Sequence, residues 1–236
     1  MNIIFKVFLI LHIVGGSVGL LTGMLNIVRK KGDKNHKLVG RVFLISMLTA
    51  GISSLILASI HTNYFLFMVG VFTLYMVGSG QLYLKGHNNT TSKSIGWTIT
   101  ILMLLAGILF VGFGVLALAK TNLFGLVFVT FGCLGLLFVR QDFKNNKGQS
   151  AIKNYGLLAH LQRMTGGFIV ALTAFLVVNA KYFPEQIPSF LYWLLPTIIL
   201  TPLIIKWSRK YGSTTILIEN LEFSYFFNLV DSSKSE

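Results

Sequence analysis

Charged residues are scarce in this sequence, and acidic residues are the scarcest among them. Asp, Glu, Lys and Arg together make up 11% of the 236 residues, while 54% of the residues are hydrophobic. A soluble domain ordinarily carries about a quarter charged residues. The composition therefore excludes an ordinary soluble domain and predicts a protein whose surface faces lipid.

Cysteine and proline are also rare. Cys133 is the single cysteine, which excludes an intrachain disulfide and a metal site built from four cysteines. Because it lies in an apolar run, we expect it to act as a small buried hydrophobic side chain. All four prolines lie at or after residue 184, which argues against the proline-broken spans found in transporters.

Long hydrophobic runs are abundant. Runs of 18 or more residues recur, and each is long enough to cross a hydrocarbon core of roughly 30 Å at about 1.5 Å per helical residue. We expect an all-α membrane protein, a bundle of about seven transmembrane helices over residues 1–210, followed by a cytoplasmic tail at 211–236. The predicted spans are 3–28, 38–60, 64–84, 95–119, 122–140, 156–180 and 189–207.

The basic residues are distributed unevenly among the connections between these spans. If the basic connections face the cytoplasm, only Lys6, Lys120 and Lys181 of the 20 Lys and Arg residues lie outside. This asymmetry predicts an inner-membrane protein with its N-terminus outside and its C-terminus in the cytoplasm. The basic residues form no continuous face interleaved with aromatics, so nucleic acid is excluded as a partner.

Two ionisable residues, His160 and Arg163, lie one helical turn apart inside the sixth predicted span. A charge at the middle of a spanning helix costs about 2.5–3.5 kcal/mol on insertion scales, and such residues normally face the bundle interior. We therefore expect a polar pocket at the cytoplasmic side, with Asp142 as a candidate partner for Arg163. The predicted ligand-binding residues at this depth are His36, Arg41, Gln81, Arg140, Asp142, His160 and Arg163.

These residues also have structural interpretations that remain open. Arg41 and Arg140 are placed where arginines reach lipid headgroups, and Asp142 can pair with either Arg140 or Arg163. Asp33 is a candidate N-cap for the second predicted helix.

The histidines are candidate metal ligands, namely His12, His36 and His160. With the N-terminus outside, His12 and His160 lie about 15–20 Å apart along the membrane normal, so they cannot share one metal. His36 and His160 form the only pair at comparable depth. A backbone carbonyl on a neighbouring helix would satisfy His12 equally well.

Glycines repeat every four residues in the first span, at Gly15, Gly19 and Gly23, and Gly167 follows Arg163 on its face. Glycines at this interval let helices approach closely in lipid. The alternative is that they leave room for a flat ligand beside a histidine.

Four segments of the chain resemble a known family. They read HIVGGSVGLLTG, KGDKNHKLVGRVFLISML, AHLQRMTGGFIVALTAFLVVN and YWLLPTIILTPLIIKW, and they run from His12 to Trp207. Their order and content are similar to a family of bacterial multi-pass membrane proteins known as domain of unknown function 2306. The resemblance implies a helical inner-membrane protein in which His12, His36, Arg41, His160 and Arg163 occupy motif positions.

Four functions remain compatible with the sequence. The favoured one is a protein that binds or transports a small anionic or lipid-like ligand in the cytoplasmic Arg and His pocket. The second is a b-type haem or quinone-linked redox protein. An enzyme using His160 and Asp142 as acid and base is the third, although no H-E-x-x-H, G-x-S-x-G or P-loop motif is present. The fourth is an accessory or assembly protein.

Overall fold

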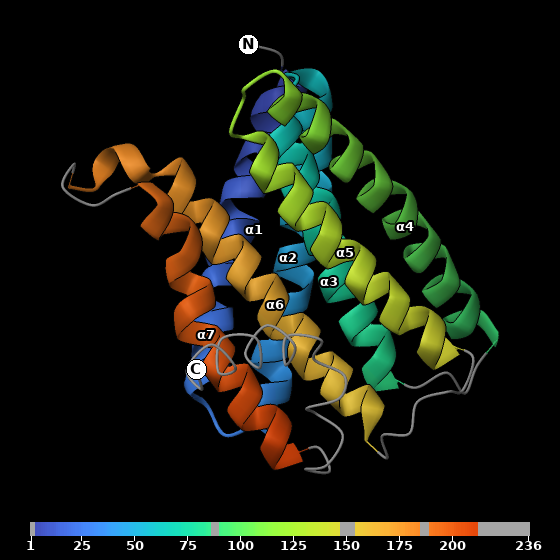
Figure 1. The fold of residues 1–236 in the computed structure, drawn as a ribbon. Coiled ribbons are helices and arrows are strands. Elements are labelled where there is room, and N and C mark those ends of the chain that lie inside the picture. The colour runs from blue at the N-terminus through green and yellow to red at the C-terminus, as the bar shows by residue number, and fades with distance from the viewer. Residues whose placement is uncertain (1–2, 86–89, 147–153, 185–188, 212–236) are drawn as a thin grey trace, which may run out of the picture.

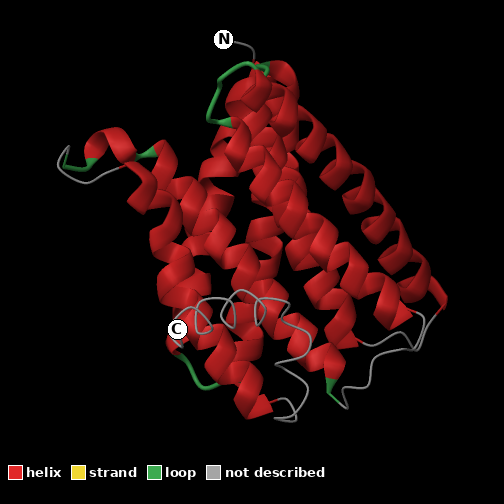
Figure 2. Cartoon of the chain, in the orientation of Figure 1, coloured by secondary structure: helices red, strands yellow, loops and turns green. Residues whose placement is uncertain are grey.

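The computed structural model describes residues 3–85, 90–146, 154–184 and 189–211, so the predicted tail beyond Tyr211 lies outside the described residues. Within these ranges the chain is helical (Figures 1 and 2). The elements are α1 (Ile3–Val28), α2 (Lys34–Ile60), α3 (Tyr64–Lys85), α4 (Thr90–Ala119), α5 (Gly125–Asn146), α6 (Tyr155–Val178), the short 3-10 helix η1 (Ala180–Tyr182) and α7 (Ser189–Tyr211).

All seven long helices of the described residues are long and apolar enough to cross a bilayer. The expected all-α architecture with seven spans is therefore confirmed. Several helices extend beyond the predicted spans at their polar ends. The second helix begins at Lys34 rather than residue 38, because the Asp33 carboxylate accepts a hydrogen bond from the His36 backbone N–H at 2.6 Å. Asp33 is thus the N-cap that the sequence predicts.

The third helix is the centre of the bundle. It packs against α2, α4 and α6, while α1 packs on α2, α5 on α4 and α7 on α6. Figure 1 shows α4 at one edge of the bundle, beside α5. The core around α3 consists of apolar and aromatic side chains contributed by four helices: Phe72, Tyr75, Met76, Met103, Val139 and Val170.

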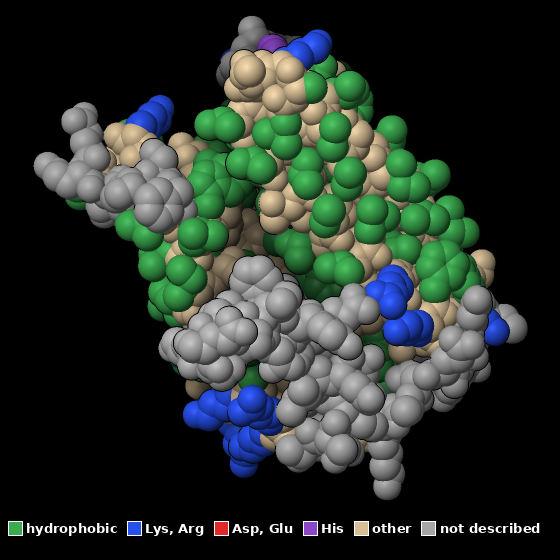
Figure 3. All heavy atoms as spheres, viewed as in Figure 1, with side chains coloured by type: hydrophobic (Ala, Val, Ile, Leu, Met, Phe, Trp, Pro, Cys, Tyr) green, Lys and Arg blue, Asp and Glu red, His purple; other side chains and the backbone are tan. Residues whose placement is uncertain are grey.

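The outer surface of the bundle is apolar. Figure 3 shows hydrophobic side chains covering the middle of the visible face, and large residues such as Leu105 and Ile198 are more than half exposed. A soluble protein rarely exposes so large an apolar area. This exterior is suited to hydrocarbon, so the described chain is a multi-pass membrane protein.

Close contact between helices explains the glycine repeat in α1. A Cβ atom at Gly15 would lie 3.0 Å from the Ser46 carbonyl oxygen, and one at Gly23 would overlap the Phe168 ring. At Gly167 of α6, a Cβ would lie 3.1 Å from Val77 of α3. Protein atoms therefore occupy the space beside these glycines, which supports the packing interpretation over the flat-ligand one.

The two rare residue types differ in how they meet expectation, since the prolines agree with it and Cys133 does not. The seventh helix contains Pro196 and Pro202, as its predicted span does, and it is not broken at either proline. The helix continues through both of them, because neighbouring groups can compensate for the missing backbone donor in a membrane helix. Cys133 is exposed rather than buried, because it lies on the outer face of α5, where a small apolar side chain is compatible with lipid.

One end of the bundle carries most of the described basic residues, and we call it the basic end. It comprises the C-terminal ends of α1, α3, α5 and α7 and the N-terminal ends of α2, α4 and α6. Figure 3 shows Lys and Arg side chains of this end in the lower part of the view. Described basic residues at this end include Arg29, Lys30, Lys31, Lys34, Lys37, Arg41, Lys93, Arg140, Lys144, Lys206, Arg209 and Lys210.

Candidate functional site

A buried ion pair between Asp142 of α5 and Arg163 of α6 lies at the basic end of the bundle. An Arg163 Nη2 atom contacts an Asp142 carboxylate oxygen, and each side chain is 1% exposed. A second bond joins Nη1 to Asp142 Oδ2 at 3.4 Å. The pairing expected from the sequence is therefore present, and Arg163 is neutralised inside the protein.

Three hydroxyl groups complete the surroundings of the Asp142 carboxylate. Tyr75 donates to Oδ2 at 2.7 Å, Tyr83 donates to Oδ1 at 2.5 Å, and Thr100 donates to Oδ2 at 3.1 Å. An ionised carboxylate only accepts hydrogen bonds and offers about four lone-pair positions. These hydroxyls and the guanidinium therefore saturate Asp142.

Arg163 is held on all sides as well. Its Nη1 donates to Ser79 Oγ at 2.7 Å, and its Nη2 donates to the Phe138 carbonyl at 3.3 Å. The guanidinium carbon lies 4.9 Å from the Tyr75 ring centroid, 5.1 Å from Tyr83 and 5.2 Å from Phe138. Aromatic faces at this distance attract a cation, and more strongly where water is excluded.

The third helix positions three of these partners through a simple spacing. Tyr75, Ser79 and Tyr83 follow one another at intervals of four residues, which places them on one face of α3. Thr100 approaches from α4, so the network joins four helices: α3, α4, α5 and α6. The ion pair is therefore the polar centre that ties the α4–α5 hairpin to the rest of the bundle.

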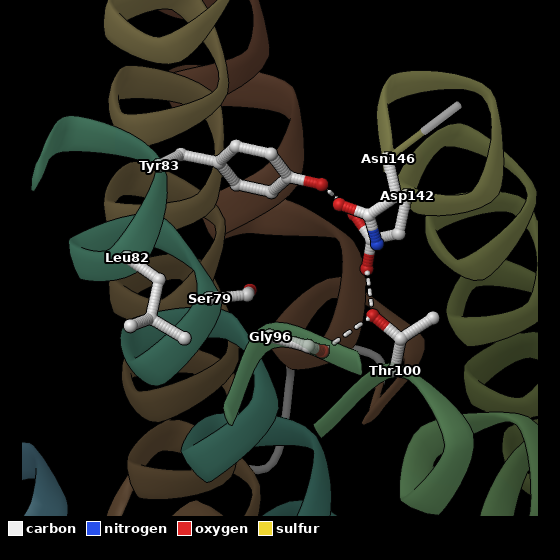
Figure 4. A pocket seen from close by; sticks show the side chains of 7 residues that line it. All are labelled: Ser79, Leu82, Tyr83, Gly96, Thr100, Asp142 and Asn146. Carbon is white, nitrogen blue, oxygen red and sulfur yellow. Dashed lines mark hydrogen bonds between the residues drawn. The ribbon is translucent and has the colours of Figure 1, made fainter. Parts of the chain in front are cut away.

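Figure 4 shows Tyr83 and Thr100 reaching the Asp142 carboxylate from different helices. The cavity beside it measures about 10 Å³ and is lined by Ser79, Leu82, Tyr83, Gly96, Thr100, Asp142 and Asn146. A cavity of this size holds about one water molecule. Binding sites for small molecules are far larger, typically about 300–1,000 Å³. Among the described residues, the cavity beside Asp142 therefore has the size of a water site rather than of a small-molecule site.

A second polar group lies at the basic end between α1, α2, α6 and α7. We call it the histidine–lysine cluster and define it by Lys31, His36 and His160. His36 interacts electrostatically with Lys31, His160 and Asp33. Its ring atom Nδ1 is buried and has no hydrogen-bond partner among the described residues. This atom is a buried polar group left unsatisfied, which ordinarily costs about 1–3 kcal/mol.

Lys31 closes the cluster from the connection between α1 and α2. Its Nζ donates to the carbonyls of Asn26 and Ile27 and lies 3.9 Å from the Trp207 ring centroid. Burial lowers the pKa of Lys31 to about 8 from its ordinary 10.5, because desolvation disfavours the ammonium form. An anion placed beside this amine would restore part of the lost solvation.

His160 and His12 are each fixed by a backbone carbonyl. His160 Nδ1 donates to the Gly80 carbonyl and His12 Nδ1 donates to the Ala50 carbonyl, both at 3.0 Å. Because a carbonyl oxygen only accepts, these bonds place the proton on Nδ1 and leave Nε2 able to accept or to ligate. His12 is therefore satisfied by a neighbouring helix, the structural alternative expected for it.

The structure thus divides the seven predicted ligand-binding residues. Asp142 and Arg163 form the ion pair, while His36 and His160 belong to the histidine–lysine cluster. Arg41 on α2 and Arg140 on α5 are exposed, and Gln81 on α3 is half-buried. Within the described ranges, no three His, Cys, Asp or Glu side chains group as they would around a metal ion.

The residues that the sequence did not single out are Tyr75, Ser79, Tyr83, Thr100 and Lys31. The signal for the first three was available, since hydroxyl residues repeat every four positions in an otherwise apolar helix. Thr100 and Lys31 carried no comparable signal. A lone threonine in a spanning helix commonly bonds its own backbone, and Lys31 belongs to a run of basic loop residues.

Residues 9–95 match a protein family described as "Predicted membrane protein (DUF2306)". Over this stretch the chain is similar to the DUF2306 family. The expected resemblance is confirmed over most of α1, all of α2 and α3 and the start of α4, a stretch that includes His12, His36, Arg41 and Gln81. The DUF2306 match ends before Asp142, His160 and Arg163. No curated protein and no solved structure matches the chain.

Proposed function

We propose that this protein binds a small anionic ligand, of the kind presented by a phosphate-bearing lipid headgroup, at the histidine–lysine cluster. The observation that carries the proposal is the buried Nδ1 atom of His36, which lies beside Lys31 and His160 and has no hydrogen-bond partner in the part of the chain that the structure describes. A phosphate oxygen would accept from both the Lys31 ammonium and a His36 N–H group. Charged hydrogen bonds of this kind contribute about 1.5–3 kcal/mol each.

The position of the cluster supports this assignment. It lies where four helices end at the basic end, and exposed cations such as Lys34, Lys37 and Arg209 lie at the same end. Asp33 is the described acid that faces His36, and its carboxylate is already engaged as the N-cap of α2. Juxtamembrane cations attract anionic headgroups by about 1 kcal/mol each, so this end concentrates the proposed ligand.

This proposal changes the roles of two predicted binding residues. Because Arg163 is paired with Asp142 and enclosed by aromatic rings, it supports the bundle behind the ligand rather than holding it. Arg41, Gln81 and Arg140 lie at the same end of the bundle but are not among the three residues that define the cluster. Transport would require a passage past the ion pair, so binding is the function that the geometry favours.

The test compares Lys31→Gln with Lys34→Gln in purified protein held in phosphatidylcholine nanodiscs without free detergent. Trp207 fluorescence reports binding in a parent protein with Trp97→Phe and Trp193→Phe, because Lys31 lies against the Trp207 ring. Two ligands distinguish the source of the phosphate, namely vesicles containing phosphatidylglycerol and inorganic phosphate. We expect Lys31→Gln to weaken vesicle binding about tenfold, which corresponds to about 1.4 kcal/mol, and Lys34→Gln to change it less than about twofold. Equal losses in the two variants, or equal binding of uncharged vesicles, would contradict the proposal.

The orientation and cell location are part of the same proposal. We place the basic end in the cytoplasm, with residues 211–236 as a cytoplasmic tail in the inner membrane, because basic connections are retained on that side. A fluorescent protein fused after Glu236 should fluoresce, and alkaline phosphatase fused there should be inactive. Active phosphatase at this position would reverse the orientation and remove the cluster from cytoplasmic ligands.

A b-type haem between His36 and His160 is the second candidate. The two imidazoles are close enough to interact electrostatically, and the bond from His160 Nδ1 leaves its Nε2 free to ligate iron. Expression with added haem, followed by an absorption spectrum, tests this candidate. A Soret band lost in both His36→Ala and His160→Ala would establish it, and a purified protein without the band would reject it.

A further inference from the structure

A large cavity lies at the end of the bundle opposite to the basic end. Its volume is about 710 Å³, within the range of about 300–1,000 Å³ typical of small-molecule sites. The connections between α2 and α3 and between α4 and α5 form its rim. Its lining residues are Ala58, Thr62, Asn63, Tyr64, Phe65, Phe67, Leu109, Phe110, Phe113, Ala117, Asn122, Phe124, Gly125 and Phe128.

Aromatic rings make up half of this lining, so the cavity favours a flat partner. Tyr64 and Phe113 lie nearly parallel, with 27° between their planes and 6.5 Å between centroids. Both are more than half exposed. Phe110 and Phe124 each meet the Phe128 ring edge to face at about 6 Å. Aromatic rings bind other flat rings by stacking and by edge-to-face contact. An aromatic belt would spread around the perimeter of the bundle, whereas these rings converge on one cavity.

The polar groups of the lining select for an uncharged ligand that accepts hydrogen bonds. No Lys, Arg, Asp or Glu lines the cavity. Asn63 Oδ1 accepts from the Leu66 backbone N–H at 2.9 Å, and Asn122 Oδ1 accepts from the Phe124 N–H at 3.0 Å. These bonds occupy the two amide oxygens and leave the Nδ2 groups as donors. Thr62 adds a hydroxyl at the same rim.

We infer that this cavity is a binding site for an uncharged amphiphile with a flat ring, carbonyl acceptors and an apolar tail, which is the chemistry of a membrane quinone. The carbonyls would accept from the amides of Asn63 and Asn122 at the rim. The ring would lie among the aromatic side chains, and the tail would continue into lipid between α3 and α4. This site is separate from the histidine–lysine cluster and does not depend on the function proposed for it.

The experiment uses Trp193 as the reporter, since its ring lies 5.6 Å from Phe65 and 6.3 Å from Phe124. In a protein with Trp97→Phe and Trp207→Phe, the remaining fluorescence comes from Trp193. Decylubiquinone is titrated into the detergent-solubilised protein, because a bound quinone ring quenches tryptophan emission. We expect saturable quenching that excess phosphatidylcholine does not reverse. Quenching that never saturates, or that phosphatidylcholine reverses, would show that the cavity holds ordinary lipid and would overturn the inference.

Two matched variants locate the quinone within the cavity. Ala117→Phe places a ring into the cavity and should raise the decylubiquinone concentration at half-saturation about tenfold. Ala119→Phe makes the same change at an exposed position outside the lining and should alter this concentration less than about twofold. Phe113→Leu removes a ring without adding volume and should also weaken quenching severalfold. If Ala117→Phe does not fold, the result with Phe113→Leu tests whether the quinone binds in this cavity. Equal quenching in the parent protein, Phe113→Leu and Ala119→Phe would overturn the inference.

Discussion

Replacing Asp142 with asparagine tests whether the buried ion pair holds the helices together. The substitution keeps the side-chain shape but removes the negative charge, so Arg163, at 1% exposure, loses its counter-ion. Breaking a buried pair by removing one partner costs about 3–5 kcal/mol. We expect Asp142→Asn to lower the free energy of unfolding by about this amount, a large part of the roughly 5–15 kcal/mol that stabilises a typical domain.

The size of the stability loss in Asp142→Asn distinguishes an ion pair from ordinary polar contacts. A hydrogen bond between membrane helices contributes about 0.6 kcal/mol on average. Loss of the three hydroxyl contacts of Asp142 would then account for about 2 kcal/mol at most, counted at that value for each bond. A larger loss therefore reports the uncompensated charge of Arg163.

Reversible unfolding of the purified protein by SDS in mixed micelles measures the effect. Lys144→Gln, at an exposed position on the same helix, is the control and should change stability by less than about 0.5 kcal/mol. The double variant Asp142→Asn with Arg163→Gln removes both charges, and it should be at least about 2 kcal/mol more stable than the sum of the single effects predicts. If the single effects simply add, the two side chains are not coupled and the reasoning fails.

Three further predictions use the same unfolding and binding assays. Gly23→Ala should cost about 1–3 kcal/mol, because its Cβ would overlap Phe168, whereas Gly16→Ala, with open space around it, should be neutral or stabilising by up to about 1 kcal/mol. Asp33→Ala should cost about 1 kcal/mol of stability by removing the cap of α2, and Asp33→Asn should restore most of it. Vesicle binding should weaken as pH rises through about 8, because Lys31 then loses its proton, and this pH dependence should be absent in Lys31→Gln. Folding stability should change in the opposite sense, since Lys31 stays protonated in the unfolded chain up to about 10.5 and stability rises with pH between these values.

The sequence predicts the spans and the main ion pair because both depend on strong local costs. A run of apolar residues must enter lipid, and an arginine inside such a run must find a partner within the bundle. Asp142 is one of seven acids in the chain and one of two among the described residues. The pairing of Asp142 with Arg163 could therefore be predicted because acidic residues are so few, as well as from the positions of the two residues in the sequence.

The partners of the ion pair could not be predicted because they depend on which helices are neighbours. Helical periodicity gives the face of a residue but not the identity of the helix opposite to it. Thr100 bonds its own helix at Gly96 and also reaches Asp142, whereas the bonds of Thr22 to described residues stay within α1. In the sequence these two threonines look alike. The quinone-sized cavity is hidden for the same reason, because its lining comes from residues at four separate places in the chain.

The balance of charge at the basic end leads to the last prediction. Both described acids are engaged, Asp33 in capping α2 and Asp142 in binding Arg163. Within the described residues, these two carboxylates are therefore not available to exposed lysines such as Lys34 and Lys37, and the attraction of these lysines for anionic lipid depends on the ionic strength. The Debye length falls from about 10 Å at 0.1 M salt to about 3 Å at 1 M. We expect vesicle binding to weaken strongly over this range, as measured by vesicle flotation.

The contribution of Lys31 should respond differently to salt. Its amine lies against Trp207 and beside two backbone carbonyls, so salt screens it less than it screens an exposed lysine. The ratio of affinities between the parent protein and Lys31→Gln should therefore remain within about twofold of its low-salt value, even where total binding has fallen. A ratio that collapses to one at high salt would mean that Lys31 acts as one more surface charge. In that case the histidine–lysine cluster would contribute nothing specific to anion binding, and the basic end would serve only to orient the protein in the membrane.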